Sequence, residues 1–284
     1  MKTNRYIPVW VVVAVLIMLS SCVKDILYNT PHPESGAVVL MLEGAPDGEV
    51  FVAGIDGQTA DMDGLPFTWP ELLKPGDYSL VVHNRAEGFA FDGRTARVDA
   101  VAGSSDAGEV LLNPLPGDLH TCSCRITVVQ DDTVRMNAVV ERRTRDLMFE
   151  LEVTQGRPEL IQTVTGTLQG IAGTFDMEAG QTTGDAASTA LSFTREGSKL
   201  TAEARLLGTM GAVQTLVLDI VFTDGGRTQR TEVDLTEALA DFNGDMTTDY
   251  RVTGTLETPV GMEEGKGEIT GWEPVEGGDV SAEM

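Results

Sequence analysis

The stretch TLVLDIVFTDGGRTQRTEVDL, residues 215–235, decides the fold class of this chain. Its two arms alternate apolar and polar residues, which places the apolar side chains on one face of a β-strand. Between the arms, Asp224-Gly225-Gly226 supplies residues that favour a tight hairpin turn. The stretch therefore predicts two antiparallel strands with one face in a core.

The same pattern extends in both directions from this hairpin. At Lys74-Pro75-Gly76-Asp77-Tyr78, Pro presets φ at the second position of a turn and Gly supplies positive φ at the third. Helical patterns are confined to residues 158–161 and 236–242. We therefore expect an all-β chain, with further strands within residues 37–44, 49–57, 77–84, 125–129, 146–156, 163–173 and 198–208.

The length and composition predict more than one domain. The chain has 284 residues, of which 42% are hydrophobic, so it can bury a substantial core. Evenly spaced short strands favour β-sandwiches, and two sandwiches in tandem suit this length better than one. The polar stretch at residues 130–133 is the best boundary. We expect an N-terminal β-sandwich over residues 36–132 and a C-terminal β-sandwich over residues 133–284.

The first 21 residues are typical of a secretory signal peptide. Lys2 and Arg5 precede an apolar run over residues 9–19, which as a helix would rise only about 16 Å, too little to cross a membrane. The run ends in Leu19-Ser20-Ser21-Cys22, which resembles the bacterial lipobox. We expect a signal peptidase to recognise Leu19, Ser20 and Ser21, and Cys22 to be lipidated ahead of a linker over residues 22–35. The alternative is an ordinary signal peptide with a chance cysteine.

The charge of the chain excludes one class of partner and its composition disfavours catalysis. Acidic residues outnumber basic residues 44 to 20, and a net charge of −24 would repel a phosphate backbone, so we expect no nucleic-acid binding. No nucleophile motif or phosphate-binding glycine loop is present, and with 44 acidic residues chance carboxylate pairs are common. We expect no enzyme activity and no cofactor.

The segment His120-Thr121-Cys122-Ser123-Cys124 places one imidazole and two sulfurs at alternate positions of a strand. A soft-metal site is one interpretation, but no second ligand cluster follows and the spacing differs from that of zinc knuckles, so we expect no metal. A disulfide between Cys122 and Cys124 is possible if a turn intervenes, because alternate Cα atoms of a strand lie at the limit of bridging geometry. Two half-buried thiols are the simpler expectation.

Two other short motifs resemble fragments of calcium-binding loops. Asp61-Met62-Asp63-Gly64 and Asp241-Phe242-Asn243-Gly244-Asp245 contain acidic residues at short spacing, but the second lacks the Glu that an EF-hand loop requires. Asp, Asn and Gly are also the commonest turn residues. We therefore expect solvated turns at both places.

The order of these pieces resembles the FimB/Mfa2 family of fimbrial anchor subunits from Bacteroides and Porphyromonas relatives. The resemblance rests on Cys22, on the hairpin at residues 73–78, on residues 145–149 leading into residues 164–173, and on the terminal Ile269-Thr270-Gly271-Trp272. It implies two tandem transthyretin-like β-sandwiches and a lipid anchor in the outer membrane at the cell surface. It also implies a partner, the fimbrial stalk subunit, joined by exchange of a β-strand.

The last apolar stretch is our candidate for the exchanged strand, with Ile269, Gly271, Trp272 and Val275 as its main residues. A sandwich that lacks one strand exposes unpaired backbone groups beside an apolar groove, and a neighbour's strand satisfies both. The alternative for this segment is an ordinary last strand with Trp272 in the core. For the whole protein, the alternative is a surface polysaccharide-binding lipoprotein of a glycan-uptake system.

The position of the first arginine bears on which strand is exchanged. In the stalk subunits of the family, an Arg-specific protease is understood to remove the first strand. In this chain the first arginine after Cys22 is Arg85, which follows three of the expected strands. We expect the first strand to stay in place, because cleavage at Arg85 would remove much of a sandwich core. The alternative is that no protease meets the protein and the lack of an early arginine is chance.

We predict that Cys22→Ala releases a folded, soluble protein from the membrane. Loss of the acyl chains removes about 0.8 kcal/mol for each buried CH₂ group and leaves the sandwiches untouched. Membrane fractionation, with mass spectrometry of the mature N-terminus of the parent chain, checks this prediction. A secreted variant that still sediments with membranes would show that the body of the protein itself binds the membrane.

Overall fold

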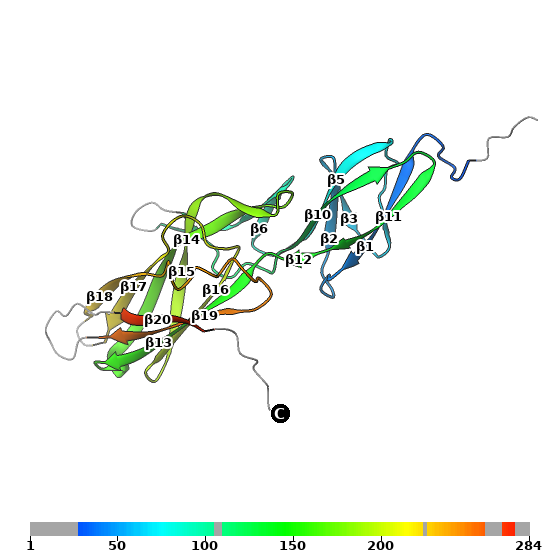
Figure 1. The fold of residues 1–284 in the computed structure, drawn as a ribbon. Coiled ribbons are helices and arrows are strands. Elements are labelled where there is room, and N and C mark those ends of the chain that lie inside the picture. Colours follow the sequence, from blue (N-terminus) through cyan, green and yellow to red (C-terminus); the bar gives the residue numbers. More distant parts are fainter. Residues whose placement is uncertain (1–27, 105–109, 224–225, 259–268, 276–284) are drawn as a thin grey trace, which may run out of the picture.

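The computed structural model describes residues 28–104, 110–223, 226–258 and 269–275, and strands dominate them (Figure 1). The predicted all-β fold with two tandem sandwiches is therefore confirmed. The one helix in the described residues is the 3-10 turn η1 (Pro158–Leu160), and none is long and apolar enough to cross a membrane. The expected signal peptide and the lipidation site at Cys22 lie outside the described residues.

The N-terminal sandwich packs two sheets against each other around one apolar core, which includes Val38, Leu40, Leu80 and Ile126. The first sheet has the order β11-β1-β4 and the second has the order β12-β10-β5-β2-β3. Their strands are β1 (Gly36–Glu43), β2 (Phe51–Ile55), β3 (Gln58–Met62), β4 (Phe67–Thr68), β5 (Gly76–Asn84), β10 (His120–Val128), β11 (Asp132–Val139) and β12 (Glu141–Arg142).

The C-terminal sandwich is a single path of strands in the order β18-β17-β14-β15-β16-β13-β19-β20. The long strand β15 pairs with β14 and, near its end, with β16, so it links the two faces of the sandwich. The strands are β13 (Arg145–Gln155), β14 (Ile161–Asp176), β15 (Gln181–Glu196), β16 (Lys199–Leu206), β17 (Thr215–Phe222), β18 (Thr228–Asp234), β19 (Tyr250–Glu257) and β20 (Ile269–Val275).

Four short strands between β5 and β10 cross from the first lobe to the second. They are β6 (Phe89–Asp92), β7 (Thr95–Val98), β8 (Ala100–Ser104) and β9 (Val110–Leu112). Strand β7 pairs with β14, and β9 runs parallel to β15. Figure 1 shows β6 at the end of the C-terminal lobe that faces the N-terminal lobe, and β7 lies between β6 and β14. The chain therefore contributes to the second sandwich before it completes the first.

The boundary that we predicted between residues 132 and 133 differs from the observed one. Residue 132 begins β11, which pairs in parallel with β1 along its whole length, so the N-terminal sandwich continues through β12. Gln130 and Asp131 at the predicted boundary lie in the tight turn between β10 and β11, where Asp131 adopts a φ of 57°. Turn residues inside a domain and at its end have the same composition, and only the pairing distinguishes them.

The hairpin predicted for residues 215–235 is present. Strands β17 and β18 pair in antiparallel register from Thr215↔Asp234 to Val221↔Thr228. The expected helix at residues 158–161 is the 3-10 turn η1, whereas residues 236–242 form hydrogen-bonded turns. Ala238, Leu239 and Phe242 in those turns are buried in the C-terminal core, so packing determines the path of this segment.

We predict that Gly36→Ala destabilises the N-terminal sandwich by about 1–3 kcal/mol, the usual cost of overpacking. A Cβ atom at Gly36 would lie 2.5 Å from both Val128 Cγ1 and the Val129 backbone oxygen. Gly64→Ala is the matched control, because a Cβ atom there meets nothing within 4 Å. Urea unfolding compares the two variants, and equal midpoints would contradict the close packing of β1 against β10.

Candidate functional site: the first strand, the lobe junction and the last strand

The first strand lies in the middle of its sheet. Strand β1 pairs in parallel with β11 over eight residues and in antiparallel register with β4 on its other side. The side chains of Val38 and Leu40 have no exposed surface. Burial of such side chains contributes about 1.5–3 kcal/mol each, so removal of β1 would expose a groove and cost much of the domain's stability.

The chain just before β1 is held by one carboxylate. Asp131, in the β10–β11 turn, accepts hydrogen bonds from the backbone N–H groups of Asn29 and Thr30, both at 2.7 Å. These bonds lower the pKa of Asp131 below its ordinary value. The Asp131 backbone N–H also donates to the Ser35 carbonyl at 2.9 Å. The segment leading from the predicted linker therefore enters β1 through a fixed turn.

The first arginine after Cys22 lies on the surface, immediately after β5. The Arg85 side chain is 59% exposed and pairs with Asp61 at 2.5 Å, while its backbone N–H donates to the Val50 carbonyl. Strands β1 to β5 all precede it. Cleavage there would separate five strands, rather than three, from the rest of the sandwich.

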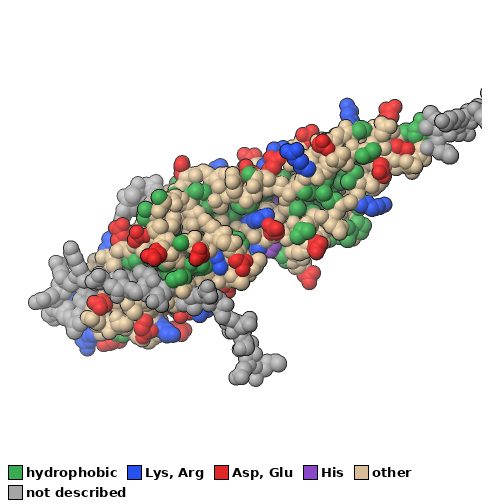
Figure 2. Space-filling model, viewed as in Figure 1, with side chains coloured by type: hydrophobic (Ala, Val, Ile, Leu, Met, Phe, Trp, Pro, Cys, Tyr) green, Lys and Arg blue, Asp and Glu red, His purple; other side chains and the backbone are tan. Residues whose placement is uncertain are grey.

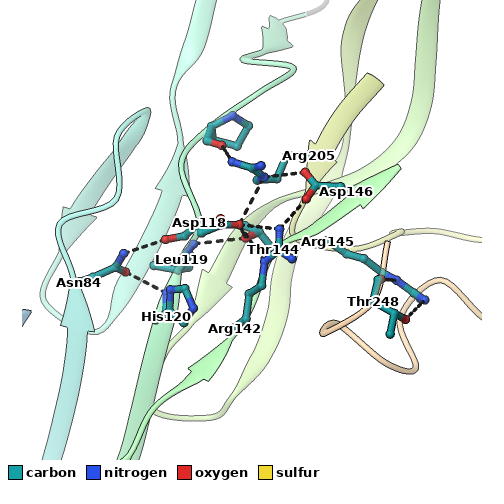
Figure 3. A network of polar contacts seen from close by, with 11 residues as sticks. Asn84, Asp118, Leu119, His120, Arg142, Thr144, Arg145, Asp146, Arg205 and Thr248 are labelled. Atoms are coloured by element: carbon teal, nitrogen blue, oxygen red, sulfur yellow. Dashed lines mark hydrogen bonds and ion pairs between the residues drawn. The ribbon is translucent and has the colours of Figure 1, made fainter. Parts of the chain in front are cut away.

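Charged side chains from both lobes meet at the junction between them (Figure 3). Arg142 of the N-terminal lobe donates to Asp118 at 2.6 Å and to Asp146 of β13 at 2.7 Å. Arg205 of β16 donates from Nε to Asp146 at 2.7 Å and lies 3.3 Å from Asp118. Two carboxylates and two guanidinium groups therefore alternate across the junction.

Buried neutral groups complete this network. The side chain of Asn84 donates to the Asp118 carbonyl at 2.7 Å and accepts from the His120 backbone N–H at 2.8 Å. Thr144 donates to Asp118 Oδ1 and accepts from the Leu119 backbone N–H. Asn84 and Thr144 are fully buried, so an unpaired group at either position would be costly.

Burial and ion pairing act in opposite directions on the Asp146 carboxylate. Its burial raises the pKa, but hydrogen bonds from Arg205 and Arg142 outweigh that effect and hold the pKa below the ordinary value. Asp146 is therefore charged at neutral pH even though only 13% of its side chain is exposed.

Packing joins the lobes beside this network. The His83 ring of β5 stacks on the Phe91 ring of β6, with centroids 4.2 Å apart. Ser79 of β5 donates to Glu178, in the β14–β15 turn, at 2.6 Å. Leu119, just before β10, is buried in the core of the C-terminal sandwich. An open cleft of about 520 Å³ next to the network is lined by residues of both lobes, including Arg143 and Thr247.

The second of the calcium-like loops is organised by an internal cation. Arg145 is buried, and its guanidinium donates to the carbonyl oxygens of Phe242 and Thr248, both at 2.7 Å. The same group lies 4.6 Å from the ring centroid of Tyr250. The side-chain amide of Asn243 donates a hydrogen bond to the hydroxyl of Thr209, which lies outside the loop. Arg145 thus binds a carbonyl oxygen of this loop, that of Phe242.

Cys122 and Cys124 are both free thiols. Strand β10 keeps its regular register, with the two cysteines opposite Val82 and Leu80, so no turn shortens the distance between them. The possible disulfide is therefore not formed in this structure. Within the described ranges, no three His, Cys, Asp or Glu side chains are grouped so that they could hold a metal ion.

The candidate exchange segment is strand β20. It pairs in antiparallel register with β19 and ends the strand order of the C-terminal sandwich. The register shifts between Thr253 and Thr255. Pro274, which cannot donate a backbone hydrogen bond, lies within β20 and is exposed, as expected in an edge strand. Leu19, Ser20, Ser21 and Cys22 lie outside the described residues, as does the Trp272 side chain.

Comparison with known proteins identifies the family. The family model described as fimbrillin-A associated anchor proteins Mfa1 and Mfa2 matches residues 50–276, which is most of the chain. The chain belongs to this family. It is thereby a fimbrial and adhesion protein of a structural, non-enzymatic family, and the resemblance stated from the sequence is confirmed. A search of curated proteins found no match.

Solved structures share the fold of this anchor-family chain at low sequence identity. The fimbrial anchor protein Mfa2 from Porphyromonas gingivalis is 12% identical with a TM-score of 0.54, and the match covers 78% of this chain and 91% of that one. A proposed adhesin from Bacteroides ovatus is 18% identical with a TM-score of 0.56, covering 84% and 90% of the two chains. At these identities the likeness concerns the fold alone.

The sequence analysis missed the junction network. The run Glu141-Arg142-Arg143-Thr144-Arg145-Asp146 concentrates charge in a short stretch between two strands, and that was the available signal. The sequence also did not predict that the Asp131 carboxylate accepts hydrogen bonds from the backbone just before β1. On the face shown in Figure 2, acidic side chains are spread over both lobes and basic side chains do not gather into a patch.

We predict that Asp146→Asn lowers the free energy of unfolding by about 1–3 kcal/mol near pH 7, because it removes one of the two carboxylates that Arg142 and Arg205 share and leaves Asp118 as their remaining charged partner. The folded pKa of Asp146 is lowered, so its stabilisation is present above the unfolded pKa of about 3.9 and lost as pH falls through the folded value. The difference between parent and variant should therefore shrink toward about pH 3.

Denaturant unfolding across this pH range measures the effect. Asp219→Asn is the control, because its pair with Arg230 is long, at 3.4 Å, and both side chains are largely exposed. We expect the free energy of unfolding of Asp219→Asn to stay within about 0.5 kcal/mol of that of the parent. An equally small loss of unfolding free energy in Asp146→Asn, or a loss that does not vary with pH, would contradict the stabilising role of the Asp146 carboxylate at the junction.

Proposed function

We propose that this protein is a lipid-anchored subunit at the end of a fimbria, which tethers the filament to the outer membrane and exposes it at the cell surface. Membership of the Mfa1 and Mfa2 anchor family is the observation that carries this proposal. Acyl chains on Cys22 would supply the membrane attachment, since a chain with a net charge of −24 gains nothing from anionic lipid.

We infer that β1 remains in place in the assembled filament. Its central position between β11 and β4, its fully buried Val38 and Leu40, and the clamp from Asp131 all support its retention. Arg85 is too far along the chain for a cut that would free β1 alone. A subunit with its first strand retained and joined to lipid has no open groove at that position, so it would end a filament.

The stalk subunit is then joined through β20, which we propose is the exchangeable strand. Strand β20 has β19 as its one partner among the described strands, its register is irregular, and it contains a proline. A stalk strand that replaced it on β19 would regain the same backbone hydrogen bonds. Strand β1, with two partners, lacks these properties.

Two engineered disulfides test which strand is exchanged. Thr255→Cys with Thr270→Cys joins β19 to β20, and Val39→Cys with Thr68→Cys joins β1 to β4, both at facing positions. In cells, we expect the oxidised β20 lock to prevent stalk attachment and reduction to restore it, while the β1 lock leaves attachment intact. Detergent-resistant complexes recovered from outer membranes give the readout.

The four single-cysteine variants control for side-chain loss. Attachment that survives the β20 lock but fails with the β1 lock would overturn the assignment of the exchanged strand. Recovery of glycans with no fimbrial subunit from the unmodified protein would overturn the anchor role and favour the polysaccharide-binding alternative.

A further inference from the structure

Three sulfur atoms from two strands meet inside the N-terminal sandwich. Cys124 Sγ on β10 lies 3.4 Å from Met136 Sδ on β11. The Cys124 thiol also hydrogen bonds to the sulfur of Cys122, two residues earlier on the same strand. The two cysteines are close in the sequence, whereas the Met136 thioether approaches them only because β10 and β11 belong to sheets that pack against each other.

The cluster lies where the two sheets meet at one side of the sandwich. Met136 pairs with Leu40 of β1, and β11 forms the outer strand of its sheet. Cys122 is buried in the core, whereas Cys124 and Met136 are partly exposed and pack against that core. A small ion could therefore reach the sulfurs from solvent without unfolding of the domain.

The surroundings favour a thiolate within the cluster. The hydrogen bond from Cys124 lowers the pKa of Cys122 to about 7, against the opposing effects of burial and Glu141, and the positive charge of Arg143 adds to the lowering. The same hydrogen bond raises the pKa of Cys124. A thiolate is the form of cysteine that binds metals.

The donor set determines which metal would fit. Thiolates and thioethers are soft ligands and select Cu(I), whereas structural zinc sites use four ligands from cysteine, histidine or carboxylate. Three sulfurs arranged around an ion at about 2.3 Å each would lie about 4 Å apart. The observed contact of 3.4 Å is slightly shorter, so a modest outward rotation of two side chains would open the site.

We propose that Cys122, Cys124 and Met136 form a binding site for one Cu(I) ion. On binding, the ion forms bonds to both cysteine sulfurs and to Met136 Sδ, and the protons that the two thiols still carry are released to solvent. Copper enters and remains as Cu(I), and the sulfurs are not oxidised. The site belongs to the N-terminal sandwich and includes no residue of β20, so the proposal does not rest on the proposed anchor role.

The test uses the full chain with Cys22→Ala, which leaves Cys122 and Cys124 as the only cysteines. Anaerobic titration with Cu(I) against a chromogenic Cu(I) chelator should show one tightly bound equivalent, with an ultraviolet sulfur-to-copper band. Ag(I), a redox-inert probe of the same softness, should compete for it. Cys122→Ser should abolish binding.

Met136→Leu provides the decisive variant, because this volume-conserving change preserves the fold and removes one ligand. We expect it to weaken Cu(I) binding by at least about tenfold. Met41→Leu, at an exposed methionine of β1, is the matched control and should bind as the parent does. Urea unfolding confirms that each variant is folded. Equal affinity for the parent and Met136→Leu, or one equivalent still bound by Cys122→Ser, would overturn the site.

Discussion

The crossing of the chain between its two lobes is the constraint on which the rest of the structure depends. After β5 the chain leaves the first sandwich, adds β7 and β9 to the second, and returns as β10. The return passes through Asp118 and Leu119, of which one joins the ion-pair network and the other enters the C-terminal core. The strands of the N-terminal sandwich lie on both sides of this crossing in the chain, and the crossing itself adds strands to the C-terminal sandwich.

This arrangement gives the junction an unusual mixture of polar and apolar contacts. Interfaces between ordinary tandem domains are small and permit relative motion. Here a stacked His83–Phe91 pair, a shared core and a buried network with alternating charges act together. Buried ion pairs contribute little net stability but are costly to break, so they fix one arrangement of the lobes against alternatives. In the proposed anchor, a fixed junction would transmit tensile force on the filament to β1, the strand that follows the lipid anchor.

The two terminal strands of the fold differ in how firmly they are held. Strand β1 lies between two partners, and its approach is clamped by Asp131, whereas β20 has β19 as its only partner in the strand order given by the structure. An edge strand exposes one row of backbone groups, which is both a risk of aggregation and an opportunity for assembly. The fold thus separates a strand suited to permanent attachment from one suited to exchange.

The sequence by itself determined the class of the fold and much of its local structure. Period-two patterns and turn residues such as Lys74-Pro75-Gly76 act over a few neighbours, so the strands, the β17–β18 hairpin and the family resemblance could be read from them. Contacts between residues far apart in the sequence could not be predicted from such local patterns. The parallel pairing of β1 with β11, the approach of Met136 to Cys124 and the meeting of Asp118 with Arg205 each join residues whose local patterns carry no information about their partner. Only the tertiary structure decided these contacts, because they depend on which of many compatible strand pairings buries both cores at once.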